Sequence, residues 1–140
     1  MLLLAGCGQS EKASEKAKNS SVTANQNSTN VTVNEKQVYI DESQYEGDEL
    51  ALVKLLNQST KYRNEENEAE YMALISDEPY TPITQMGSDK IIDIRIKAIG
   101  DISDTMGVIE TLVTTEGLPQ GFQMYVFHKI NGQWKIYDID

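Results

Sequence analysis

Residues 122–139 read FQMYVFHKINGQWKIYDI, two runs of β-branched and aromatic residues that meet at Asn131-Gly132. An Asn-Gly pair between such runs is the strongest short-range signal for a β-hairpin with a two-residue loop. This loop sets the register, because each residue then has a defined partner across the hairpin. The sequence therefore predicts that Phe127 faces Ile136 and that Tyr125 faces Asp138.

The same register sorts the side chains of the hairpin into two faces. One face collects Tyr125, Phe127 and Trp134 with a single carboxylate, that of Asp138, and is the candidate pocket. A buried Asp beside a Tyr hydroxyl can act as a base with a hydrogen-bond donor, because burial raises the pKa of a carboxyl group. The favoured interpretation is structural: a Tyr hydroxyl that satisfies a carboxylate near the end of the sheet.

The other titratable residues are predicted to lie on solvated faces. His128 is the only His, and the register pairs it with Lys135 on the outer face of the hairpin. The acidic run at 65–70 lacks the Asp/Asn and Gly spacing of a calcium loop. One Cys and one His are too few for a zinc site. The sequence therefore predicts no catalytic residues, no metal site and no cofactor.

Further strands are predicted before the hairpin. Ile92, Ile94, Ile96 and Ala98 alternate with charged residues, which is typical of a strand with one buried face. Residues 105–115 are rich in β-branched side chains and form the next strand. With the hairpin, these runs predict a four-stranded antiparallel meander.

The stretch before the sheet has helical spacing. Asp48 and Glu49 are placed where the positive end of a helix dipole favours acids. Apolar residues then recur at spacings of three and four. The polar run at 64–67 can interrupt this pattern, which resumes up to Ile75 and ends before Pro79. The sequence predicts either one long helix or two consecutive helices.

Helices followed by a meander form an α+β fold, and this order resembles the NTF2-like superfamily. The resemblance covers residues 47–140 and is carried by the closing hairpin and by the helical stretch around Tyr62. It implies that the helices pack on a strongly curved sheet. Enzymes of the superfamily place acids, His or Tyr on the concave face. A cystatin-like fold has the same element order and is the alternative, which a strand near Val38 would favour.

Leu4-Ala5-Gly6-Cys7 resembles the lipobox of bacterial lipoprotein signal peptides. The resemblance implies that Cys7, the only Cys of the chain, carries a diacylglyceryl group and that the chain is cleaved just before it. Residues 1–6 would then be the end of a signal peptide. A complete signal has a basic region and a longer apolar run, so we expect the true start to lie upstream.

Charge and composition divide the rest of the chain. Residues 7–46 are predicted to form a disordered polar linker behind the lipidated Cys7, and 47–140 to form the domain. The net charge is −10, and most of it falls on the domain. Such a surface repels nucleic acid and anionic lipid headgroups, so attachment to a membrane must come from the lipid anchor.

These features predict a protein anchored to the outer face of the cytoplasmic membrane of a Gram-positive bacterium. Its domain is predicted to be a non-catalytic binding or interaction module of the cell envelope. The expected partner is an envelope protein or a small apolar ligand. The alternative is a small NTF2-like enzyme that acts on an apolar substrate through Asp138 and Tyr125.

Overall fold

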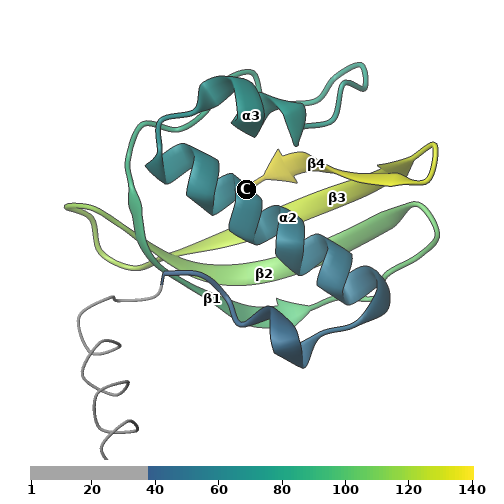
Figure 1. Cartoon of the computed structure of the whole chain (residues 1–140), viewed down its shortest axis with the longest axis horizontal. Coiled ribbons are helices and arrows are strands. Elements are labelled where there is room, and N and C mark those ends of the chain that lie inside the picture. Colours follow the sequence, from purple (N-terminus) through teal and green to yellow (C-terminus); the bar gives the residue numbers. More distant parts are fainter. Residues whose placement is uncertain (1–37) are drawn as a thin grey trace, which may run out of the picture. The chain divides into compact units, whose positions relative to one another are not determined.

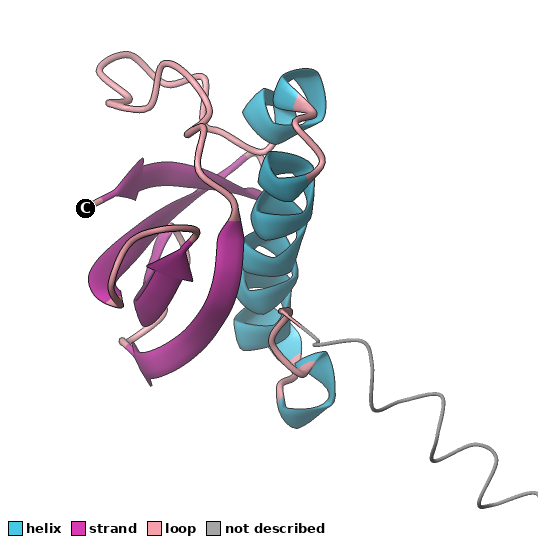
Figure 2. Cartoon of the chain, turned by 90° about the vertical axis from the view of Figure 1, so that its left-hand side faces the viewer, coloured by secondary structure: helices cyan, strands magenta, loops and turns pink. Residues whose placement is uncertain are grey.

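The computed structural model describes residues 38–140, in which helices pack on one face of a four-stranded antiparallel sheet (Figure 1). The view from the side shows the helices as one layer and the sheet as the other (Figure 2). The sheet order β1-β2-β3-β4 is that of a meander, and the predicted α+β class is confirmed. The elements are η1 (Glu42–Gln44), α2 (Gly47–Asn64), α3 (Glu68–Ala73), β1 (Ile91–Ile99), β2 (Met106–Thr115), β3 (Gly121–Ile130) and β4 (Gln133–Ile139).

The helical stretch forms two helices because the polar run between them interrupts the helical backbone conformation. Glu66 has a φ of 59°, in the left-handed region that does not continue an α-helix. The Asn67 side chain then caps α3 by accepting the backbone N–H of Glu70 at 3.4 Å. Of the two predicted arrangements, the structure therefore has two consecutive helices.

The β3–β4 hairpin turns at the predicted position. Asn131 and Gly132 both have positive φ, 52° and 78°, as a two-residue type I′ loop requires. Phe127 lies opposite Ile136, so the predicted register is confirmed over the part of the hairpin next to the turn.

Further from the turn, β4 contains a bulge at Tyr137 that shifts the register. Asp138 lies opposite Val126, and Ile139 lies opposite Tyr125. The predicted pairing of Tyr125 with Asp138 is therefore wrong. Its physical reason is the extra residue, which reverses the alternation of side chains beyond it and sends the carboxylate away from the core.

Strand β1 departs from simple alternation for the same reason. Its pairing with β2 is irregular at Ile92 and at Lys97. Ile94 is buried, whereas Ile92 is 40% exposed and Ala98 is exposed. The prediction that these three residues share one buried face with Ile96 is wrong, because each irregularity changes which residues point to the core.

The core lies between α2 and the sheet. The indole N–H of Trp134 donates to the carboxylate of Asp48 at 3.0 Å, which ties the first turn of α2 to β4. This hydrogen bond lowers the pKa of Asp48. Fully buried apolar side chains come from both layers: Leu52, Val53, Leu56, Ile109, Phe127 and Ile136.

The segment before α2 is part of the compact unit, which begins at Val38. The side-chain amide of Asn57 accepts the N–H of Ile40 and donates to its carbonyl, each at 2.9 Å, and also donates to Glu42. Residues 38–46, expected in the linker, thus pack on α2. No strand forms at 38–40, so the feature that would favour a cystatin-like fold is absent from the described residues. Cys7 and residues 8–37 lie outside that part of the chain.

We expect Asn57→Ala to lower the free energy of unfolding by about 1–2 kcal/mol, because the backbone of Ile40 loses both partners. Urea denaturation measures this loss, and amide hydrogen exchange at Ile40 should become faster. Gln58→Ala is the matched control, since Gln58 is the exposed neighbour on the same helix. Equal losses in the two variants would contradict the assigned role of Asn57.

Candidate functional site

The predicted aromatic face belongs to the core. Tyr125, Phe127 and Trp134 are all buried, and the Tyr125 hydroxyl donates to the Gln123 side chain at 3.4 Å. Burial raises the pKa of Tyr125, so its hydroxyl stays protonated at neutral pH. Asp138 instead accepts the backbone N–H of its neighbour Ile139 at 2.8 Å. The structure therefore does not bring Asp138 and Tyr125 together.

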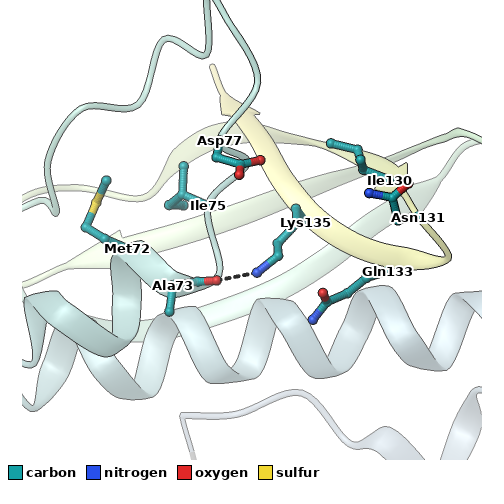
Figure 3. A pocket seen from close by; sticks show the side chains of 8 residues that line it. All are labelled: Met72, Ala73, Ile75, Asp77, Ile130, Asn131, Gln133 and Lys135. Carbon is teal, nitrogen blue, oxygen red and sulfur yellow. Dashed lines mark hydrogen bonds between the residues drawn. The ribbon is translucent and has the colours of Figure 1, made fainter.

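A pocket of about 500 Å³ lies between the end of α3, the segment that follows it and the β3–β4 hairpin (Figure 3). Its walls mix apolar side chains with amides and one charge of each sign. They are formed by Met72, Ala73, Ile75, Asp77, Ile130, Asn131, Gln133 and Lys135.

Backbone hydrogen bonds fix one wall of this pocket. Ser76 N–H donates to the carbonyl of Ile136 at 2.7 Å, and Ile136 N–H donates to the carbonyl of Leu74 at 2.9 Å. The segment around Ile75 thus makes a short parallel bridge to the outer edge of β4. The Lys135 ammonium crosses the same edge and donates to the carbonyl of Ala73 at 2.6 Å (Figure 3). The wall at the end of α3 is therefore held against β4 by these hydrogen bonds.

His128 lies beside this junction, on the sheet face away from the helices. Its Nδ1 is 2.7 Å from Oε2 of Glu78, and the Ser76 hydroxyl donates to the same oxygen at 2.9 Å. Its ring stacks on Tyr137, with centroids 4.0 Å apart. The predicted pairing with Lys135 is confirmed. The prediction of a solvated surface position is wrong, because Glu78 and Tyr137 cover the ring and leave the side chain 25% exposed.

The Glu78–His128 pair can fix the orientation of an imidazole ring. A carboxylate on Nδ1 sets the tautomer of an imidazole and leaves Nε2 as the second site for a proton. Within residues 38–140, no group of three His, Cys, Asp or Glu side chains is arranged to hold a metal ion. Glu78 is not among the residues predicted from the sequence, where its only signal is the pair of acids Asp77-Glu78 between a helix end and Pro79.

We expect Glu78→Gln to remove a pH-dependent part of the stability. The hydrogen bonds from His128 and then Ser76 hold the pKa of Glu78 below its ordinary value of 4.5. A carboxyl group with a lowered pKa in the folded state stabilises that state above its unfolded pKa, and the effect is lost as pH falls through the folded pKa. The difference in unfolding free energy between wild type and Glu78→Gln should therefore shrink as pH falls below 4.5.

Urea denaturation from neutral pH to pH 3 measures this difference. The control is a double-mutant cycle with His128→Gln, which removes the first partner of Glu78. In that background, Glu78→Gln should have a smaller effect. An unchanged effect would show that His128 does not stabilise the carboxylate.

A second surface is apolar. The outer band, on the face of β2 and β3 away from the helices, consists of Met106, Val108, Leu112, Phe122, Met124 and Val126. Phe122 is 50% exposed and Met106 is 47% exposed. The other four are half-buried, and Glu110 lies among them opposite Met124. Apolar side chains gathered on an open face are a candidate interaction surface.

No helix among the described residues is long and apolar enough to cross a membrane. No known family model matches the chain, and no curated protein matches it. The chain is similar in structure to a solved NTF-2 like protein of unknown function from Shewanella oneidensis MR-1. The two are 17% identical with a TM-score of 0.49, and the match covers 66% of this chain and 97% of that chain.

Proposed function

We propose that the chain is a bacterial lipoprotein, anchored through Cys7 to the outer face of the cytoplasmic membrane. Its domain is a non-catalytic module that binds an envelope protein. The lipobox supports the anchor, and the outer band supports the binding role. The band carries the proposal, because it is an apolar surface of the sheet that the helices leave open (Figure 2).

The arrangement of the band favours a protein partner. Its strands pair Val108 with Val126 and Leu112 with Phe122, so each of these apolar side chains has an apolar neighbour on the adjacent strand. The Lys97 ammonium lies 5.1 Å from the Phe122 ring and places a charge at the rim. Glu110 lies opposite Met124 between these two pairs, so the band is an apolar surface with one carboxylate within it and a Lys at its rim. Protein interfaces combine apolar contact with such polar groups.

The alternative, an enzyme that works through Asp138 and Tyr125, has no support from the geometry. The Tyr125 hydroxyl faces Gln123 in the core, and Asp138 lies across from Val126 after the bulge. A base and a donor that act together must each lie within hydrogen-bond reach of the same bound substrate. These two groups point to different sides of the sheet.

The anchor is tested by labelling with a clickable fatty acid in the native bacterium, with the gene at its own locus. The wild-type protein should take up the label and fractionate with the membrane, and Cys7→Ser should do neither. Absence of label from the wild type, or equal labelling of both proteins, would refute the anchor.

The band is tested by photo-crosslinking in the same cells. A benzophenone amino acid at Phe122 should form an adduct of one defined mass, and Met124→Lys should abolish it without changing the melting temperature. The same probe at Tyr80, which is 95% exposed and lies off the band, is the control. Equal adducts at both positions, no adduct at Phe122, or an adduct of two copies of this chain would overturn the proposal.

A further inference from the structure

We propose that the pocket between α3 and the β3–β4 hairpin binds a small zwitterion of the amino-acid class, with an apolar side chain. This site is separate from the outer band and does not depend on it. A volume of about 500 Å³ is in the range of small-molecule sites and too small for a folded partner.

The charges that line the pocket define the ligand. The Lys135 ammonium uses one hydrogen-bond donor on the carbonyl of Ala73, and a Lys ammonium has three. The remaining donors can bind a carboxylate. Lys135 is the only basic side chain of the pocket wall, and Asp77 is the only acidic one. Within residues 38–140 these two do not form an ion pair with each other (Figure 3).

A ligand with both an ammonium and a carboxylate can pair with both charged side chains of the pocket. The amine would bind Asp77, and the carboxylate would bind Lys135. A plain anion would meet the field of a chain with a net charge of −10 and only one cation at the site. A plain cation would leave the Lys135 ammonium to repel it. The zwitterion is therefore the charge class that fits best.

The apolar part of the wall accommodates a side chain. Met72, Ile75 and Ile130 contribute apolar surface, and Met adapts its shape to different groups. Ile75 is held by its bridge to Ile136, so this surface exists before any ligand binds. A preformed wall reduces the ordering cost of binding.

The test is a two-dimensional NMR titration of the full chain with L-leucine. We expect saturable shifts of the backbone amides of Ala73, Asp77 and Lys135. Lys135→Met and Asp77→Asn should each weaken binding about tenfold, as expected for loss of one hydrogen bond to a charged group. N-acetyl-leucine, which lacks the amine charge, and leucinamide, which lacks the carboxylate, should each bind about tenfold more weakly to the wild type.

Lys54→Met and Asp101→Asn are the matched controls, because they make the same charge changes at exposed positions outside the pocket. Asp77→Asn also keeps the test valid if Lys135→Met disturbs the end of α3. The proposal is overturned if leucine gives no saturable shift at about 10 mM. It is also overturned if either blocked derivative binds as tightly as leucine, or if pocket and control variants lose affinity equally.

Discussion

Phe127→Ala is expected to lower the free energy of unfolding by about 3–5 kcal/mol, the cost of removing a fully buried aromatic ring. The Phe127 side chain has no exposed surface and lies in the central part of the core. It stands opposite Gly107 on β2 and Ile136 on β4, and its ring stacks with that of Tyr125 at 6.4 Å. Truncation to Ala leaves a cavity in the core between the helices and the sheet. Urea denaturation at neutral pH measures the loss.

Phe122→Ala is the matched control, because these are the only two Phe residues and they lie on opposite faces of β3. Phe122 is 50% exposed, so its truncation should cost less than about 1 kcal/mol. The two variants remove the same atoms and differ only in burial. Similar losses would mean that the assigned faces of β3 are incorrect.

Gly107→Val is expected to lower the free energy of unfolding by about 3 kcal/mol through overpacking. A Cβ atom at Gly107 would lie 2.6 Å from Cδ1 of Leu52, which is closer than two non-bonded carbon atoms can approach. Leu52 is fully buried in α2, so it has little room to move. The close approach of α2 to β2 depends on the missing side chain at this position.

Gly121→Val separates this effect from a general cost of replacing Gly in a strand. Gly121 begins β3, and a Cβ atom there would have no neighbour within 4 Å. We expect little change in stability or a small gain, because Val favours the extended backbone. A destabilisation equal to that of Gly107→Val would contradict the steric explanation.

The local parts of the fold could be predicted from the sequence. The turn at Asn131-Gly132 depends on the backbone preferences of two adjacent residues, so its position and the register next to it are correct. The break between the helices likewise depends on a short polar run. Both are decided by interactions between residues that are close in the sequence.

The candidate site could not be predicted in the same way. Glu78 and His128 are 50 residues apart, and Lys135 and Ala73 are 62 residues apart. Sequence periodicity reports which face of an element a residue occupies. It contains no information about which segment packs beside that face. The pocket and the Glu78–His128 pair exist only because the segment after α3 bridges to β4 at Ile75.

The bulges separate the features that the sequence predicts from those that it does not. The sequence by itself determined the α+β class, the order of the elements, the turn and the faces close to it. Only the tertiary structure decided that Tyr137 and Ile92 are extra residues, because a bulge depends on how a strand fits its neighbours and the helix above it. The extra residue Tyr137 places Asp138 away from Tyr125, because one additional residue in a strand reverses which face each later side chain occupies.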